Sequence, residues 1–583
     1  MKLILSYIKP RRRLALFGVT VKAISTILLL LLPYVLEHLV DSVVPRKELP
    51  AVLLWGGAMI ALALAERYMN LKSSQIAVKV ARGSVYDLRQ DLFSRAVALS
   101  GSQTDRFGLP SLTSRLTADV YNVQGFMQLL LTFAFRAPIL VLGSVALTLT
   151  MDAGLALILC ILAPLMVAAV AIVSWKGIPL YAKVQKKVDT ATRVLRENIT
   201  GVRVVKALAK EEHEGRRFGE ANDALARSDQ TAGVVMSLPG PVATLLLNVG
   251  LVVIVLVGAR RVDAGLTRPG VILAFLTWFN FLLMGVMGLN RIFMMLSKAR
   301  ASANRIAEVL DQPEALPVIE AEREDGGDCV VFDHVSFGYG MESAAAAGAG
   351  FVGGRREMSL DDISFSVKKG GSLGIIGPTG CGKSTIVDLL MRFYDATKGR
   401  VLVDGLDVRG YEKDALRGKF GAVFQNGALF AGSFAENIAF GREVSEAALK
   451  AAAADAMALE FIEAAEGGFE HRIAAHGADL SGGQRQRVLI ARALAADPEI
   501  LILDDASSAL DYRTDAALRR AIRERHGGTT TIVVAQRISS IAHSDQILVL
   551  DEGRIIGRGT HEELLQSCPQ YLEIYKTQMG EAV

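Results

Sequence analysis

The stretch from residue 373 to residue 393 decides how the second half of this chain folds. At its centre is a run that fits the phosphate-binding-loop (P-loop) pattern Gly-x-x-x-x-Gly-Lys-Ser and is followed by Thr385: Gly377-Pro378-Thr379-Gly380-Cys381-Gly382-Lys383-Ser384. An apolar segment that predicts a strand precedes the run, and a helical segment follows it. Glycines let backbone N–H groups wrap around phosphates, and a helix N-terminus carries about +0.5 of a charge. This order therefore predicts a nucleotide-phosphate site.

Two further features assign roles to single residues at this site. Lys383 is expected to reach the β- and γ-phosphates, and Ser384 is expected to supply a ligand to Mg²⁺. A second apolar strand, residues 500–503, ends in Asp504-Asp505, which places Asp504 where a carboxylate holds Mg²⁺. The two features together predict an ATPase or GTPase domain.

The first half of the chain is dominated by long apolar runs. A helix needs about 20 mostly apolar residues to span a bilayer, because the lipid core holds no water for unpaired backbone groups. Six segments meet this condition, roughly 14–40, 51–72, 124–149, 153–175, 236–259 and 270–296. The sequence therefore predicts a multi-pass domain in a lipid bilayer.

Two long polar segments follow the second and the fourth span. They are rich in Lys and Arg, as is the cluster Arg11-Arg12-Arg13 before the first span, so the positive-inside rule places all three in the cytoplasm. The polar segments break at 100–110 and 206–215, which predicts helical hairpins with cytoplasmic tips; solvated loops are the alternative. Arg260 and Arg261 follow span five on the opposite side and conflict with the rule.

Charge and cysteine usage exclude other classes of protein. The net charge of +4 is small for 583 residues and gives no support for nucleic-acid binding, which would need a concentrated basic face. The cysteines Cys160, Cys329, Cys381 and Cys568 have no CxxC spacing, so neither a disulfide framework nor a zinc site is expected.

Between the two phosphate-binding motifs lies a run that carries a more specific likeness: Leu480-Ser481-Gly482-Gly483-Gln484-Arg485-Gln486-Arg487. It resembles the signature of the ATP-binding-cassette (ABC) family, and the order of membrane domain and cassette resembles the type IV exporter half-transporters. The resemblance implies an all-α six-helix transmembrane domain at 1–310, a linker at 311–328 and an α/β P-loop cassette domain at 329–583 that binds ATP with Mg²⁺.

Other positions match the family's pattern one by one. Tyr339 resembles the aromatic residue that stacks on adenine, Gln425 resembles the Q-loop residue that touches Mg²⁺, and Asp511 resembles the D-loop aspartate. The resemblance implies that the signature presents N–H groups to a γ-phosphate held by a second subunit. The Ala- and Gly-rich segment 341–354 replaces the family's short connection and is expected to be a surface loop.

Two positions depart from the family at the catalytic centre. Asp505 stands where the family has the glutamate that accepts a proton from the attacking water. Its side chain is one methylene shorter, so its carboxylate lies about 1.5 Å, one C–C bond length, further from that water. Gln536 stands where the family has the switch histidine, and an amide carries neither a proton nor a charge. Both changes predict a pocket that binds ATP and hydrolyses it poorly.

The intact signature beside a weak P-loop site predicts a heterodimer. The partner is expected to be a second, non-identical half-transporter. It should carry a glutamate at the position of Asp505 and a histidine at the position of Gln536. The alternatives that the sequence leaves open are an importer on the exporter fold and an ATP-gated assembly that does not export.

The cargo and the location follow only loosely from the sequence. Span six carries Met284, Met287, Met294 and Met295, with Trp278 and Phe281 nearby. Flexible thioethers and aromatic rings suit a pocket for amphipathic or drug-like small molecules, although packing roles are the alternative. The expected location is the plasma membrane, a bacterial inner membrane, with the ATP-binding domain in the cytoplasm.

Overall fold

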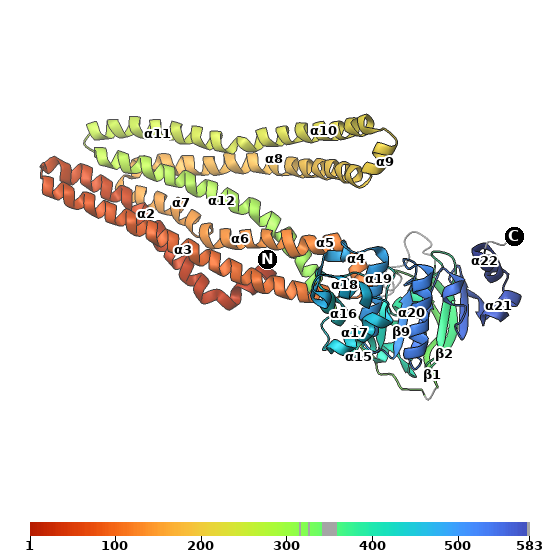
Figure 1. The fold of residues 1–583 in the computed structure, drawn as a ribbon. Coiled ribbons are helices and arrows are strands. Elements are labelled where there is room, and N and C mark those ends of the chain that lie inside the picture. The colour runs from red at the N-terminus through yellow and green to blue at the C-terminus, as the bar shows by residue number, and fades with distance from the viewer. Residues whose placement is uncertain (314–315, 325–326, 341–357, 580–583) are drawn as a thin grey trace. The chain divides into compact units, whose positions relative to one another are not determined.

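The computed structural model describes residues 1–313, 316–324, 327–340 and 358–579 (Figure 1). The segment 341–354, expected to be a surface loop, lies outside the described residues, as do four positions of the predicted linker. The chain divides into two compact units, Met1–Ala98 with Leu109–Gln312, and Leu99–Gly108 with Pro313–Val583. The short segment 99–108 therefore groups with the second unit, and the exact limits of the two family domains remain predictions.

The first unit consists of helices. Six stretches among the described residues are long and apolar enough to cross a membrane, which confirms the predicted six-helix class. The elements that carry them are α2 (Arg12–His38), α3 (Leu49–Val97), α6 (Val120–Phe133), α7 (Arg136–Met151), α8 (Ala153–Thr200), α11 (Pro239–Asp263) and α12 (Pro269–Leu310). Shorter elements are α1 (Lys2–Ile8), α5 (Leu109–Ser114), α9 (Val202–Ala207) and α10 (Glu211–Ser237). Within this unit α2 lies beside α3, and α8 lies beside α10 and α11 (Figure 1).

The predicted third span, 124–149, is interrupted. The helix α6 ends at Phe133 and α7 begins at Arg136. Pro138 explains the interruption, because a proline ring clashes with the carbonyl four residues earlier, here that of Ala134. A proline near the start of α7 is tolerated, since the first N–H groups of a helix have no partner inside it.

Two side chains show how polar groups are accommodated in the first unit. Arg261 forms an ion pair with Asp152 at 3.0 Å, so its side chain has a specific partner in the connection between α7 and α8. This pairing accounts for a basic residue on the side that the positive-inside rule disfavours. Trp278 is fully buried and donates a hydrogen bond from its indole nitrogen to the Leu30 carbonyl at 2.9 Å. It packs in the core, and so the packing alternative holds for this aromatic residue.

The second unit is built around a six-stranded sheet in the order β12-β11-β3-β10-β9-β6. The strands β11, β3, β10, β9 and β6 are parallel, and β12 is antiparallel to β11. Their bounds are β3 (Ser372–Ile376), β6 (Phe420–Val423), β9 (Ile500–Asp504), β10 (Thr530–Val534), β11 (Gln546–Asp551) and β12 (Arg554–Gly559). Parallel strands bring their carboxyl ends to one edge, which is where open α/β sheets bind ligands.

Two smaller sheets complete the second unit. One is antiparallel in the order β2-β1-β4-β5, from β1 (Asp328–Phe337), β2 (Leu360–Lys368), β4 (Lys398–Val403) and β5 (Leu406–Asp407). The other pairs β7 (Gly432–Ser433) with β8 (Arg472–Ile473). The first sheet shares a continuous apolar core with β3 and β10, which includes Phe332, Phe337 and Ile375. This core fixes the strand that leads into the P-loop.

The helices of the second unit lie between or after its strands in the chain, except α4, which precedes them all. They are α4 (Gly101–Phe107), α14 (Lys383–Leu390), α15 (Lys413–Arg417), α16 (Phe434–Ala439), α17 (Glu446–Asp455), α18 (Leu459–Ala464), α19 (Gly482–Leu494), α20 (Tyr512–Arg525), α21 (His561–Ser567) and α22 (Pro569–Met579). The predicted combination of an α/β P-loop domain with an all-α membrane domain is confirmed.

Candidate nucleotide site

The P-loop joins β3 to α14, as the sequence predicts. Its backbone lies so close to its surroundings that side chains are excluded at two positions. A Cβ added to Gly377 would lie 2.1 Å from the Leu550 carbonyl oxygen. Gly382 has a φ of +99° and is the N-cap of α14, and a Cβ there would lie 2.5 Å from the Ser359 carbonyl oxygen. The glycines therefore let the loop fold into the cradle that phosphates require.

Three polar side chains converge at the start of α14. The Ser384 hydroxyl donates a hydrogen bond to Asp504 Oδ2 at 2.9 Å, which joins α14 to the end of β9. Lys383 Nζ donates to the carbonyl oxygens of Gly377 and Pro378, each at 2.8 Å. Its ammonium group is thus held over the loop. A hydroxyl and a carboxylate side by side are oxygen donors of the kind that Mg²⁺ prefers, so these residues fit the predicted ion.

Asp505 and Gln536, the two residues that differ from the family's pattern, are in direct contact. Gln536 Nε2 donates a hydrogen bond to Asp505 Oδ2 at 2.9 Å, just beyond the ends of β10 and β9. The backbone N–H of Asp505 donates to the Val534 carbonyl at 2.9 Å, and its φ is +50°, in the left-handed region. The Asp505 carboxylate is therefore engaged by an amide donor, and its backbone is fixed by a strand-end hydrogen bond.

A cavity of about 260 Å³ brings most of the predicted nucleotide-binding residues together. Its lining also includes Ser359, Val534 and Ala535, and its predicted members are Tyr339, Thr379, Gly380, Gly382, Lys383, Ser384, Thr385, Gln425, Asp504, Asp505 and Gln536. Gly377 and Pro378 do not line the cavity but accept hydrogen bonds from Lys383 through their carbonyls, and Cys381 is buried. Burial raises the pKa of the Cys381 thiol, which keeps it protonated.

The signature residues lie elsewhere on the same unit and do not line this cavity. Ser481 is the N-cap of α19, where its hydroxyl accepts from Gln484 N–H while the Gln484 side chain accepts from Ser481 N–H. Gly482 is exposed and Gly483 half-buried at the helix start. Asp511 is the N-cap of α20 and accepts from Thr514 N–H at 2.9 Å. These helix starts are formed and accessible, separate from the P-loop.

Burial governs the electrostatics of the two aspartates. Desolvation raises the pKa of Asp504; the Ser384 hydrogen bond and the Lys383 charge oppose this, and the Asp505 carboxylate adds to it. Desolvation also raises the pKa of Asp505, against the charges of Lys383 and Arg537. The Asp505 carboxylate raises the pKa of Asp504 because a nearby negative charge disfavours ionisation. A divalent cation would relieve this repulsion.

Comparison with known proteins agrees with this geometry. Residues 15–287 match the family model described as ABC transporter transmembrane region, and residues 360–508 match the model described as ABC transporter. An uncharacterized ABC transporter ATP-binding protein of Mycobacterium tuberculosis is 36% identical over 588 residues, which cover 99% of this chain and 98% of the relative. The chain belongs to the ABC transporter family.

A further relative and a solved structure indicate which fold this ABC transporter has. The ABC transporter ATP-binding protein YfiB of Bacillus subtilis is 33% identical over 583 residues, 99% of this chain and 98% of the relative. A solved bacterial Atm1-family ABC exporter with ATP bound has a TM-score of 0.81 and 26% identity, over 97% of this chain and 99% of that one. The ABC transporter therefore has the exporter fold, with its transmembrane and ATP-binding domains in one chain.

Sequence reasoning missed a set of contacts around Tyr339. Its hydroxyl lies 3.2 Å from Thr385 Oγ1 and donates to Asp388 Oδ2 at 3.2 Å. Its ring meets the ring of Tyr394 edge to face, with centroids 5.2 Å apart at 88°. Tyr394 in turn donates a hydrogen bond to Asp105 Oδ2 of α4 at 2.6 Å. No local pattern pairs residue 105 with residue 394, since 289 positions separate them.

This set connects the predicted adenine-stacking residue to α4. Gly101 lies against the Tyr394 ring, and a Cβ there would lie 2.7 Å from the ring carbon Cζ. The glycine thus allows the first turn of α4 to rest on Tyr394. Burial, followed by the hydrogen bond and charge of Asp105, holds the pKa of Tyr394 above its usual range, so the hydroxyl remains a donor.

Gly377→Ala is expected to abolish tight ATP binding, because its Cβ has no space next to the Leu550 carbonyl. We expect the affinity of the purified ABC transporter for a fluorescent ATP analogue to fall more than about tenfold. This fall corresponds to a loss of more than about 1.4 kcal/mol of binding free energy when the loop is displaced. Gly528→Ala is the matched control, since a Cβ there meets no atom within 4 Å. Equal affinity of the Gly377→Ala protein and the wild type would contradict the assignment of the loop.

Tyr394→Phe is expected to loosen α4 while leaving ATP affinity within about threefold. It removes a hydrogen bond to a carboxylate, worth about 1.5–3 kcal/mol, and keeps the ring against Tyr339. Hydrogen exchange of residues 101–107 should become faster. Tyr411→Phe, which removes a hydrogen bond to the Val403 carbonyl at 2.8 Å, is the control and should leave this segment unchanged. Unaltered exchange in the Tyr394→Phe protein would refute the link.

Proposed function

We propose that this ABC transporter is one half of a heterodimeric exporter of amphipathic or drug-like compounds, and that its own nucleotide site binds ATP and hydrolyses it slowly. The observation that carries the proposal is the hydrogen bond from Gln536 Nε2 to Asp505 Oδ2 at 2.9 Å. It couples the two departures from the family pattern at one point. When ATP and Mg²⁺ are bound, they supply the phosphoryl group and the charge that stabilises it; the chain's residues supply position and proton transfer.

The slow-hydrolysis part of the proposal follows from what Asp505 can do. A general base must approach the water within hydrogen-bond reach, and losing a well-placed one costs about 10²–10⁴ in rate. The Asp505 carboxylate is one bond shorter than a glutamate, its backbone is tied to Val534, and one of its oxygens accepts from Gln536. Each constraint holds the oxygen back from a water above the phosphate loop. Gln536 keeps a hydrogen-bonding amide but adds no charge.

The binding part of the proposal follows from the rest of the pocket. Lys383, Ser384 and Asp504 are positioned together, and the loop has the glycines that phosphates need. Tyr339 offers a ring that is 41% exposed for stacking on a base. Loss of the base alone therefore leaves ATP affinity in place and lowers turnover.

The dimeric part of the proposal rests on where the signature lies. The cavity of about 260 Å³ is smaller than the 300–1,000 Å³ typical of ligand clefts, and no signature residue lines it. The start of α19 is formed and accessible, as a surface that completes another chain's pocket must be. A partner with a strong base opposite this signature would give the pair one fast site and one slow site.

The amphipathic character of the cargo is supported by polar groups inside the apolar first unit. Lys22 is buried and donates to Asn70 Oδ1 at 2.5 Å. Glu66 is buried too, and accepts from Ser25 and Asn70, each at 3.2 Å. Ionisable residues within membrane helices commonly serve transport, because they are expensive to keep there otherwise. Met284, 52% exposed, adds a flexible apolar surface, while the side chain of Met294 lies outside the description.

The double substitution Asp505→Glu with Gln536→His is expected to raise ATP hydrolysis at this chain's own pocket by about tenfold or more, because it restores a base of full length and a titratable partner. Steady-state phosphate release by the purified chain measures the change. Adding Lys383→Ala to the double variant should abolish the gain. Unchanged hydrolysis would show that neither side chain limits the pocket.

The purified chain without any partner is expected to bind ATP and to turn it over slowly, and its residual rate should barely respond to Asp505→Asn. Brisk hydrolysis that depends on Asp505 would refute the slow-site proposal. Transport is tested in inverted membrane vesicles that contain this chain with a candidate partner, using ethidium as a fluorescent amphipathic cargo. ATP-dependent uptake supports an exporter, whereas ATP-controlled conductance without uptake favours the gated assembly.

A further inference from the structure

The N-terminal segment of the first unit is fastened to the helix α3. Ile4 and Ile8 of α1 are buried. The Tyr7 hydroxyl donates to Asp91 Oδ2 at 2.7 Å, and the Arg11 guanidinium donates to the two oxygens of Asp87 at 2.5 and 3.3 Å. Two apolar and two polar contacts therefore fix the chain just before α2 begins.

The sequence of α3 prepares this attachment. Gly83, Asp87 and Asp91 recur every four residues, so they lie along one face of the helix. A Cβ added to Gly83 would lie 2.5 Å from Arg11 Nε, so the glycine makes room for the guanidinium. Both acidic residues of this face are engaged by Arg11 and Tyr7, so they are not partners for the other cations of the segment.

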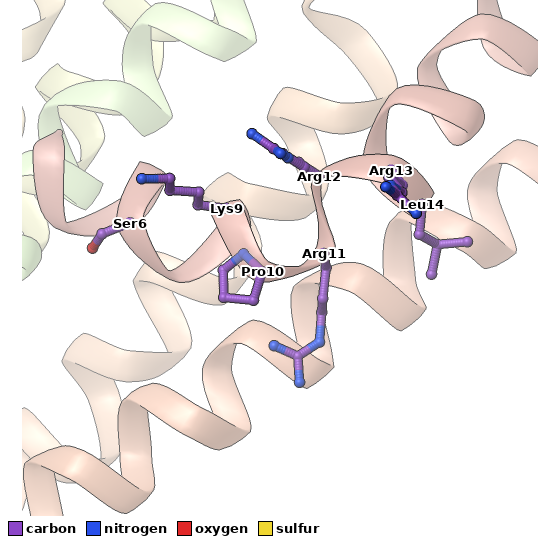
Figure 2. Close-up of a pocket in the computed structure, with 7 residues that line it drawn as sticks. All are labelled: Ser6, Lys9, Pro10, Arg11, Arg12, Arg13 and Leu14. Atoms are coloured by element: carbon purple, nitrogen blue, oxygen red, sulfur yellow. The ribbon is translucent and has the colours of Figure 1, made fainter.

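Besides Lys2, three cations of the segment have no carboxylate partner within the described residues: Lys9, Arg12 and Arg13. All three are exposed. With Ser6, Pro10, Arg11 and Leu14 they line a shallow cavity of about 750 Å³ (Figure 2). Figure 2 shows Arg11 reaching toward the helix below it, while Lys9 and Arg12 extend to the other side of the segment.

The position of this cavity along the chain indicates its surroundings. It lies where the apolar part of α2 begins, at Leu14, and α1 beside it exposes Leu5 by 54%. A short helix with an apolar exposed residue and neighbouring cations is typical of the membrane interface. The basic residues place this end of α2 on the cytoplasmic side, where the leaflet carries negative surface charge.

We propose that Lys9, Arg12 and Arg13 form a binding site for the phosphodiester headgroup of an anionic phospholipid in the cytoplasmic leaflet. Three cations without a carboxylate partner match an anionic phosphate, and basic pockets at this depth bind such headgroups. Two of the cations are guanidinium groups, which donate in pairs to phosphate oxygens. The contacts of Tyr7 and Arg11 hold the backbone in place, so little ordering is needed on binding. This site is independent of the proposed slow hydrolysis.

The test uses the full chain in bilayer nanodiscs of phosphatidylcholine. A trace of spin-labelled phosphatidylglycerol or spin-labelled phosphatidylcholine is added, and electron paramagnetic resonance gives the relative association of each with the protein. The test variant combines Lys9→Gln, Arg12→Gln and Arg13→Gln. The control removes three exposed lysines of the second unit, Lys368→Gln, Lys369→Gln and Lys398→Gln. ATP binding confirms that each variant is folded.

The wild type and the control are expected to prefer phosphatidylglycerol over phosphatidylcholine. In the test variant this preference should fall at least about fivefold, because a single cation near a charged membrane surface contributes about that much. An unchanged preference in the test variant, or an equal loss in the control, would overturn the site. If the triple variant fails to fold, the three single substitutions are measured in its place. An unchanged preference for phosphatidylglycerol in all three would also overturn the site. Displacement of the lipid signal by millimolar glycerol phosphate would overturn the lipid assignment in favour of a soluble phosphate.

Discussion

The hydrogen bond between Ser384 and Asp504 connects the start of α14, which follows β3 through the P-loop, to the end of β9. It forms because β3 and β9 both run parallel to β10 and end at the same edge of the sheet. The loop after β3 can close over this edge only because Gly377 and Gly382 carry no side chain where carbonyl oxygens of Leu550 and Ser359 lie. Backbone geometry thus comes first, and the charged groups take their positions from it.

The same edge of the sheet holds two groups of residues to which the proposed function gives different tasks, the binding of ATP and its hydrolysis. Lys383, Ser384 and Asp504 depend on the loop and on the end of β9, and these are intact. Asp505 and Gln536 depend on the next positions of β9 and β10, and there the structure joins them to each other. Asp504 and Asp505 are consecutive at the end of β9, and Gln536 lies just beyond β10. Under the proposed function the residues for binding and those for proton transfer are therefore neighbours but distinct, so a change in one group need not disturb the other.

The first unit meets a different constraint, which is that polar groups in an apolar setting need partners. Trp278 finds a carbonyl of α2, Arg261 finds Asp152, and Lys22 finds Asn70. The N-terminal segment follows the same rule with Tyr7 and Arg11. Lys9, Arg12 and Arg13, which have no carboxylate partner among the residues that the structure describes, lie together around the start of α2. An unpaired charge at a membrane interface can be satisfied by lipid headgroups as well as by protein.

The sequence alone determined what depends on local pattern. Apolar length determined the six membrane helices, glycine spacing and flanking apolar runs determined the P-loop, and the run from Leu480 to Arg487 indicated the family. Tertiary structure decided what depends on distant residues meeting. It paired Asp505 with Gln536 through neighbouring strands, whereas the interruption of the third span at Ala134 follows from a local feature, Pro138. It also brought Asp105 to Tyr394 across 289 positions. Hydrogen bonds act over about 3 Å in space, and distance along the chain does not reveal which side chains come that close.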